Sequence, residues 1–144
     1  SLQAVIAQGE IISTTLMYYY LQEQGIPSTL LSALDFMRID KDCEPDYFYI
    51  EQNLKRLLSN PATERIIITQ GFICRNAYGE IDNLKRGGSD YSAALIGAAL
   101  NVEEIQIWTD IDGVHNSDPR YVKNTKAIRS LSFDEAHFRL QPPV

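Results

Sequence analysis

Arg65-Ile66-Ile67-Ile68-Thr69 runs directly into Gln70-Gly71-Phe72-Ile73, and this stretch decides the fold class. The first segment holds four consecutive β-branched residues, which favour a strand. An apolar run without alternation is typical of a strand covered on both faces, as in a parallel sheet. We therefore expect a buried parallel strand over residues 65–69, with ligands bound beyond its carboxyl end.

Helices and strands alternate on both sides of this strand. Apolar residues at helical spacing and the signals that stop helices predict helices at 9–24, 47–59, 89–100 and 132–139. Short apolar runs and a glycine-rich stretch predict strands at 28–31 and 104–108 and a small hairpin within 71–88. The alternation predicts right-handed crossovers and a mainly parallel sheet with helices on its faces, which is an α/β fold.

The composition is that of one soluble domain. The chain has 144 residues, 44% of them hydrophobic, and a formal net charge of −6. This negative balance argues against a nucleic-acid partner, which usually meets clustered Lys and Arg. No apolar run approaches the roughly 20 residues that cross a bilayer, so we expect no membrane partner and a cytoplasmic location.

Cysteine and histidine are sparse. Cys43 and Cys74 are far apart and form no CxxC motif, so we interpret both as reduced thiols. His115 and His137 lack partners at the spacing of zinc ligands, and we expect no metal site built from protein side chains.

The first candidate binding loop is Arg86-Gly87-Gly88-Ser89-Asp90. Its two glycines allow close backbone approach, the helix that follows offers free N–H groups, and Arg86 is suited to grip a carboxylate. Asp90 could hold an ammonium group, so the loop suits a zwitterion such as an amino acid. The plainer alternative is a glycine turn before a helix capped by Ser89 or Asp90, with a solvated arginine.

The second candidate loop extends from Thr109 to Arg120 and offers hydroxyls, carboxylates and an arginine for ribose, phosphate or a metal-bound nucleotide. Its alternative is a turn-rich connection in which Asp and Ser have their usual turn roles. Trp108, just before the loop, is interpreted as a core residue. Glu10 is interpreted, from pattern alone, as an acid favoured by the dipole at the start of the first helix.

Four ordered motifs resemble those of the aspartate kinases in the amino acid kinase superfamily. They are Gln8-Gly9-Glu10 with Ser13, similar to the G-E segment; Ile68-Thr69-Gln70-Gly71-Phe72-Ile73, similar to I-T-Q-G-F; Arg86-Gly87-Gly88-Ser89-Asp90-Tyr91, similar to R-G-G-S-D-Y/F; and 107–120, similar to W-T-D-x-x-G-x-x-x-x-D-P-R. The last two motifs are specific, and together the four span nearly the whole chain.

The resemblance implies a three-layer α/β/α sandwich and transfer of the ATP γ-phosphoryl to the side chain of L-aspartate, the first step toward lysine, threonine and methionine. ATP with Mg²⁺ and L-aspartate are the implied substrates, and the intact parent is expected to be a homo-oligomer. For aspartate, the resemblance implies Glu10, Arg86, Ser89 and Asp90. For the nucleotide, it implies Thr109, Asp110, His115 and Arg120, with His115 where the family often has tyrosine or leucine.

The chain also departs from the family pattern. It contains neither the K-F-G-G-T-S-like phosphate loop nor the F-G-A-K stretch, whose lysines serve catalysis and the nucleotide, and the regulatory ACT domains are missing. We therefore expect residues 1–144 to be a partial catalytic domain that is inactive alone. Lys85 replaces a usual glycine, and Asp82-Asn83 replaces a usual threonine pair.

The sequence is also compatible with two other functions. The chain could belong to another amino acid kinase relative that acts on glutamate or a nucleoside monophosphate, although its G-E and R-G-G-S-D segments are of the aspartate type. It could also be a noncatalytic aspartate- or nucleotide-binding or assembly domain, a reading that the missing lysines favour.

Overall fold

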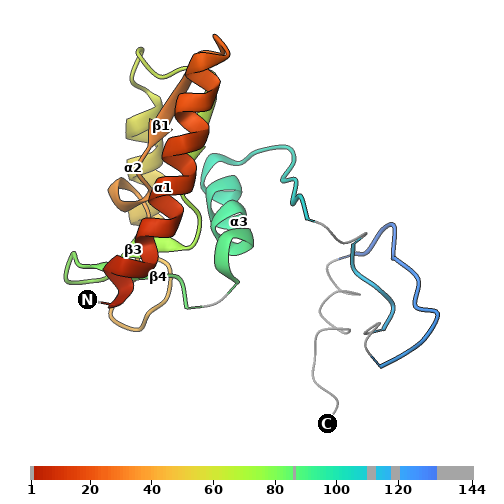
Figure 1. Cartoon of the computed structure of the whole chain (residues 1–144). Helices are drawn as coiled ribbons and strands as arrows, with labels where there is room; N and C mark the ends of the chain where they lie inside the picture. The colour runs from red at the N-terminus through yellow and green to blue at the C-terminus, as the bar shows by residue number, and fades with distance from the viewer. Residues whose placement is uncertain (1, 86, 110–112, 118–120, 133–144) are drawn as a thin grey trace. The chain divides into compact units, whose positions relative to one another are not determined.

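The computed structural model describes residues 2–85, 87–109, 113–117 and 121–132 (Figure 1). It divides into two units, residues 1–107 and 108–144. The helices and strands of the described residues all lie in the first unit. They are α1 (Leu2–Glu23), β1 (Ser28–Leu31), the 3-10 turn η1 (Ala33–Asp35), α2 (Tyr47–Leu58), β2 (Ile66–Thr69), β3 (Ile73–Arg75), β4 (Ile81–Asn83) and α3 (Gly88–Leu100).

Strands β1 and β2 form a parallel pair, in register from Ser28 opposite Ile66 to Leu31 opposite Thr69. The two expected strands and their parallel direction are confirmed. Helix α2 lies in the connection between them, as a parallel crossover requires. The expected cover on both faces is not seen, because Ile66 and Ile67 are 45% and 38% exposed. β1 is the one strand that pairs with β2 among the described residues, so the other edge of β2 is open.

The glycine-rich stretch forms the expected hairpin. Strands β3 and β4 pair antiparallel, with Ile73 opposite Asn83 and Arg75 opposite Ile81. Asn76 helps to form the turn, because its side-chain oxygen accepts hydrogen bonds from the backbone N–H groups of Tyr78 and Glu80 at 2.9 and 3.0 Å. The hairpin connects the carboxyl end of β2 to the start of α3.

Three helices were expected within the first unit, and all three are confirmed. Helix α2 begins where Asp46 accepts a hydrogen bond from the backbone N–H of Tyr49 at 3.1 Å. Helix α3 ends at Asn101 in the left-handed conformation, with φ 49°. Helix α1 begins at Leu2, earlier than the expected Gly9.

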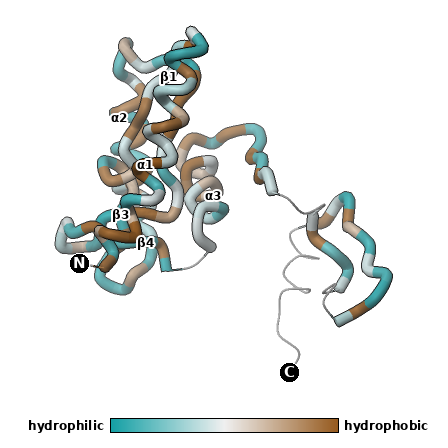
Figure 2. The backbone as a smooth tube through the Cα atoms, in the orientation of Figure 1, coloured by the Kyte–Doolittle hydropathy of each residue, from teal (hydrophilic) through white to brown (hydrophobic). Residues whose placement is uncertain are grey.

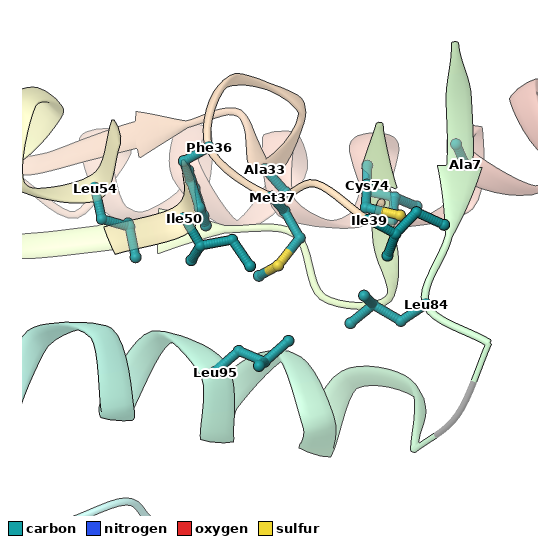
Figure 3. Close-up of a cluster of buried hydrophobic side chains, with 11 residues drawn as sticks. Ala7, Ala33, Phe36, Met37, Ile39, Ile50, Leu54, Cys74, Leu84 and Leu95 are labelled. Atoms are coloured by element: carbon teal, nitrogen blue, oxygen red, sulfur yellow. The ribbon is translucent and has the colours of Figure 1, made fainter. Parts of the chain in front are cut away.

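One hydrophobic cluster joins these elements (Figure 3). Leu95 points from α3 toward Ile50 of α2 and Met37 of the segment after η1, and all three are buried. Cys74 of β3 and Ala7 of α1 belong to the same cluster. Since α1 also lies against β1, the described part is an incomplete α/β domain with helices packed around its strands.

Helix α1 has a broad apolar face that is exposed in the part of the chain that the structure describes. The brown stretches along α1 in Figure 2 mark its apolar residues. Ile12, Leu16, Tyr19 and Tyr20, whose spacing predicted this helix, are between 55% and 65% exposed. The opposite side of α1, which carries the buried Ala7, packs toward the strands. No helix of the described residues combines the length and the apolar character that spanning a bilayer would require.

Three expectations beyond α3 fare differently. Residues 104–108 do not form the expected strand, since a strand needs a hydrogen-bonding neighbour and the described residues supply none. The prediction of Trp108 as a core residue is wrong, because its side chain is 89% exposed. Most of the helix expected at 132–139 lies outside the described residues.

Candidate functional site

The carboxyl end of β2 packs directly on the start of α3. A Cβ atom placed on Gly71 would lie 2.7 Å from Ser89 Oγ and 3.0 Å from Ser89 Cα, so a side chain does not fit there without a shift. The backbone N–H of Phe72 donates a hydrogen bond to Ser92 Oγ at 2.8 Å. The turn after β2 is thereby joined to the first turns of α3.

A small cavity of about 190 Å³ opens at this contact. It is lined by Thr69, Gln70, Gly71, Ser89, Ser92, Ala93 and Ile96. The hydroxyl of Thr69 is buried and has no hydrogen-bond partner in the described part of the chain. The cavity lies where an α/β sheet normally binds ligands, beyond the carboxyl end of a parallel strand.

The turn itself holds a strained residue. Phe72 has φ 67°, which is costly for a residue with a bulky side chain. Besides its bond to Ser92, its carbonyl accepts a hydrogen bond from the backbone N–H of Leu84 at 2.8 Å. Bonds on both sides of Phe72 therefore hold the strained conformation, a situation that is common at binding sites.

Glycines, not side-chain caps, begin α3. The helix starts at Gly88 after Gly87, with φ 51° and 67°, and no side chain caps it, so the prediction that Ser89 or Asp90 caps the helix is wrong. Gly87 suits the left-handed conformation, and a Cβ on it would lie 2.7 Å from Tyr91 Cβ. Ser89 and Asp90 are exposed in the first turn, where the helix dipole favours a negative charge or a bound anion.

Glu10 lies inside α1, and the dipole interpretation of this residue is wrong. The helix begins at Leu2, so Glu10 is more than one turn from the end, beyond the range of the dipole effect. Its side chain is half-buried, and no ion pair to it is found among the described residues. This carboxylate is thus available to a ligand cation.

Gln70 connects α1 to the end of β2. Its side-chain N–H donates a hydrogen bond to Thr14 Oγ1 at 2.8 Å, one turn along α1 from Glu10. Our sequence interpretation gave no role to Gln70, Thr14 or Ser92. The segment 70–72 therefore contacts both α1 and α3, the two helices that carry Glu10, Ser89 and Asp90.

The residues that depart from the family pattern contact one another or α1. Lys85 forms an ion pair with Asp82, and this hydrogen bond raises the pKa of Lys85. Asn83 donates a side-chain hydrogen bond to Gln3 of α1 at 2.7 Å. The substitutions are thus accommodated locally, beside the motif that begins at residue 86.

Both cysteines are free thiols, as expected. Cys43 is exposed, whereas Cys74 is buried in the core. Burial raises the pKa of Cys74 to about 12, and the nearby charge of Asp82 adds to this effect. Cys74 is therefore an inert, protonated core residue at neutral pH.

The residues predicted to bind the nucleotide belong to the second unit. His115 Nδ1 lies 2.8 Å from Thr125 Oγ1, and the backbone N–H of Ile128 donates to the carbonyl of Val114 at 2.8 Å. The segment 113–117 is thereby paired with 125–128, which orients the imidazole. Thr109 is exposed. Arg86, Asp110 and Arg120 were also predicted as site residues, and they lie outside the described residues.

The residues that the structure describes include no group of three or more His, Cys, Asp or Glu side chains able to hold a metal ion. This part of the chain does not fit a metal cage built from protein ligands alone. A Mg²⁺ ion bound mainly through nucleotide phosphates, with one or two carboxylates, does not require such a cage.

The family model and the most similar relatives that we describe point to the same protein family. The model of the amino acid kinase family matches residues 1–138. The chain is 40% identical over 144 residues to the bifunctional aspartokinase/homoserine dehydrogenase 2 of Escherichia coli, covering 97% of this chain and 18% of that protein. It is 35% identical over 135 residues to lysine-sensitive aspartokinase 3 of the same organism, covering 92% of this chain and 30% of that protein.

Solved structures agree with this similarity. The crystal structure of E. coli aspartokinase III in complex with aspartate and ADP matches with a TM-score of 0.79 at 34% identity, over 88% of this chain and 29% of that one. The Clostridium acetobutylicum aspartate kinase matches with a TM-score of 0.65 at 25% identity, over 83% of this chain and 26% of that one. The chain thus spans less than a third of the length of these relatives.

Proposed function

The chain belongs to the amino acid kinase family, and from this premise we propose that the full-length product of its gene is an aspartate kinase. The proposed reaction transfers the γ-phosphoryl group of ATP to the side-chain carboxylate of L-aspartate and yields 4-phospho-L-aspartate. The observation that carries the proposal is the contact between Gly71 and Ser89, which holds the start of α3 at the carboxyl end of β2. The aspartate and ADP bound to the similar E. coli enzyme support it.

The proposed aspartate site matches the charges of a zwitterion. In this proposal, Glu10 and Asp90 attract the ammonium group and Arg86 holds the α-carboxylate through paired hydrogen bonds. The hydroxyl of Ser89 and the free N–H groups at the start of α3 complete the pocket. Support comes from the exposure of Ser89 and Asp90 and from a Glu10 carboxylate that forms no ion pair within the described part of the chain.

The proposed nucleotide site uses Thr109, Asp110, His115 and Arg120. The guanidinium of Arg120 would neutralise phosphate charge. The hydroxyl of Thr109 would donate or accept a hydrogen bond, and the carboxylate of Asp110 would accept one from the nucleotide. The bond of His115 to Thr125 supports a fixed ring at the edge of this site. Mg²⁺ bound to ATP would supply further neutralisation of the charge that develops during transfer.

Residues 1–144 are proposed to be a partial catalytic domain. Phosphoryl transfer depends on positioning and on cations that neutralise the transferred group. The phosphate-loop and F-G-A-K lysines expected from the family resemblance are missing from these 144 residues. We therefore expect the isolated chain to bind ligands weakly and to be inactive. A homo-oligomeric, cytoplasmic full-length protein is part of the same proposal, to be tested by light scattering and cell fractionation.

The test compares ADP formation by the isolated chain and by the full-length gene product, with L-aspartate, L-glutamate and uridylate as acceptors. Aspartate-dependent activity of the full-length product alone is the expected result. Activity with glutamate or uridylate but not aspartate would point to another amino acid kinase relative. Inactivity with every acceptor, combined with aspartate binding in a calorimeter, would favour a noncatalytic domain.

One pair of variants tests the substrate pocket. Arg86→Lys removes the paired hydrogen bonds, and the loss of a charge-assisted hydrogen bond costs about 1.5–3 kcal/mol, so KM for aspartate should rise roughly tenfold or more. Arg56→Lys is the matched control, because Arg56 is exposed on α2 and bonds to Asn53 of the same helix. An equal KM for aspartate in the two variants would show that Arg86 does not bind the substrate.

A further inference from the structure

Gln70 is a buried polar residue with two long-range partners. Its side chain is 4% exposed. Its Oε1 accepts a hydrogen bond from the backbone N–H of Ala33 at 2.8 Å, and its Nε2 donates to Thr14 Oγ1 at 2.8 Å. One carboxamide therefore ties the end of β2 both to η1 and to α1.

The bond to Thr14 reaches the backbone of Glu10. Thr14 Oγ1 donates to the carbonyl of Glu10 at 2.8 Å, one turn earlier in α1. Gln70 is thus separated from the proposed ammonium-binding residue by two hydrogen bonds. The two hydrogen bonds share the hydroxyl of Thr14, which accepts from Gln70 and donates to the carbonyl of Glu10.

Apolar packing holds α1 at a small contact area. Its one fully buried residue among those described is Ala7, whose side chain is a single methyl group, and Ile11 packs half-buried against the same cluster. Hydrophobic contact is non-directional, so the rotation and height of the helix also depend on its polar bonds. Within the described part of the chain, side-chain bonds that join α1 to other segments include Gln3 to Asn83, Thr14 to Gln70 and Gln22 to Ser28. Of these three bonds, the one to Gln70 is nearest to Glu10 along the helix.

The residues after Gln70 fix the other half of the proposed site. Gly71 lies against Ser89, and the backbone N–H of Phe72 donates to Ser92 Oγ. The segment 70–72 therefore sets α1 on one side and the first turn of α3 on the other. A binding site made from two separate helices needs such a shared support, because a displacement of about 1 Å already weakens it.

We propose that Gln70 is a positioning residue for aspartate, which acts through Thr14 to hold Glu10 at the distance from Asp90 that the ammonium group requires. This inference rests on the proposed aspartate kinase function. Loss of the bond releases α1 to turn or slide, and Glu10 moves with it. Aspartate binding is then weakened, whereas ATP, which the proposal assigns to the loop from Thr109 to Arg120, keeps its affinity.

The decisive variants are Thr14→Val and Thr15→Val in the full-length protein. Valine has nearly the shape of threonine, so each change replaces a hydroxyl with a methyl group of similar size. Thr14→Val loses the bond to Gln70, whereas Thr15 Oγ1 bonds within its own helix, to the carbonyl of Ile11 at 2.6 Å. Thr15→Val is therefore the matched control. Thr14→Ser is a second control, because serine keeps the hydroxyl and loses only the methyl group.

For Thr14→Val we expect KM for aspartate to rise at least about fivefold, with KM for ATP changed less than about twofold. A fivefold change corresponds to about 1 kcal/mol of binding, the usual net contribution of one hydrogen bond. Thr15→Val and Thr14→Ser should stay close to the wild type. Gln70→Met, of similar length but without the amide, should reproduce the effect of Thr14→Val. Should it fail to fold, the threonine variants still decide the question.

Equal increases of KM for aspartate and ATP, or no increase for aspartate, would overturn the positioning role. The same conclusion follows if Thr15→Val matches Thr14→Val, because the effect would then come from a general weakening of α1. Failure of the wild-type protein to phosphorylate aspartate would instead overturn the proposed function, and that outcome is seen before any variant is made.

Discussion

Ser89 lies so close to Gly71 that a Cβ on the glycine would be 2.7 Å from the Ser89 hydroxyl oxygen and 2.8 Å from Ser89 Cβ. Gly71 has no positive φ, so the glycine is required here by lack of space and not by its backbone conformation. The contact fixes the spacing between the turn after β2 and the start of α3. A specific expectation for substitution follows from it.

Gly71→Ala should destabilise the chain by about 1–3 kcal/mol, the usual cost of overpacking, because Ser89 contributes backbone as well as side-chain atoms to the clash. Urea unfolding of the isolated chain measures the free energy of unfolding. In the full-length protein the same change should raise KM for aspartate, since α3 must move.

Gly9→Ala provides the comparison for this prediction. Gly9 lies inside α1, its φ is not positive, and a Cβ placed on it would meet no atom within 4 Å, so alanine should stabilise the helix by about 0.5–1 kcal/mol. Opposite signs for the two glycine-to-alanine changes are expected. A neutral or stabilising Gly71→Ala would show that the contact with Ser89 is looser than described.

Cys74 should make the chain sensitive to alkali. Its pKa is raised from 9.0 to about 12 in the folded state, so below pH 9 both the folded and the unfolded thiol keep their proton and stability is complete. Between pH 9 and 12 the unfolded thiol ionises first, which lowers the free energy of unfolding by up to about 1.4 kcal/mol per pH unit. Urea unfolding at pH 8, 9, 10 and 11 measures this slope.

Cys74→Ala should flatten the slope, although the small cavity lowers stability at every pH. Cys43→Ser is the control, because the Cys43 thiol is exposed and its replacement should leave the slope unchanged. Parallel curves for wild type and Cys74→Ala would contradict the assigned ionisation. A thiol reagent at pH 8 should modify Cys43 in the native chain and both cysteines in urea.

Much of the fold could be predicted because its signals are local. The β-branched run before Gln70 and the glycines after it determine β2 and the hairpin within a few residues of sequence. The prediction of a strand at 104–108 was wrong because the signal for a strand is only partly local. A strand is completed by its neighbour, and the short apolar run carries no information on whether a neighbour is present.

In the candidate site, too, local features could be predicted and contacts between distant residues could not. The glycine pair before Ser89 predicted a helix start with exposed polar residues, and the structure has one, although the glycine replaces the expected side-chain cap. The hydrogen bonds of Gln70 could not be predicted, because its partners Ala33 and Thr14 are 37 and 56 positions away. Only the three-dimensional arrangement reveals such bonds.

The ion pair between Lys85 and Asp82 should contribute little to stability. The Lys85 side chain is 39% exposed, and exposed pairs usually contribute about 0.2–1 kcal/mol. A double-mutant cycle with Lys85→Gln and Asp82→Asn should give a coupling energy in this range that falls as salt is added. A coupling well above this range, insensitive to salt, would mean that the pair is shielded from water.

The apolar face of α1 predicts that the isolated chain associates with itself. A helix that is apolar around most of its circumference is normally buried, yet Leu16 and Tyr20 are 65% and 55% exposed here. The edge of β2 that is open among the described residues, where Ile66 is 45% exposed, adds unpaired backbone groups. Water-exposed apolar surface of this kind promotes association and lowers thermal stability.

Leu16→Lys and Phe48→Lys separate the α1 face from general surface hydrophobicity. Both replace an exposed apolar side chain with a charge, but Phe48, 75% exposed, lies on α2. Analytical ultracentrifugation should show oligomers for the wild-type chain and for Phe48→Lys, and fewer for Leu16→Lys. A monodisperse wild-type monomer that unfolds cooperatively at high temperature would contradict the prediction, because this face would then be stable in water.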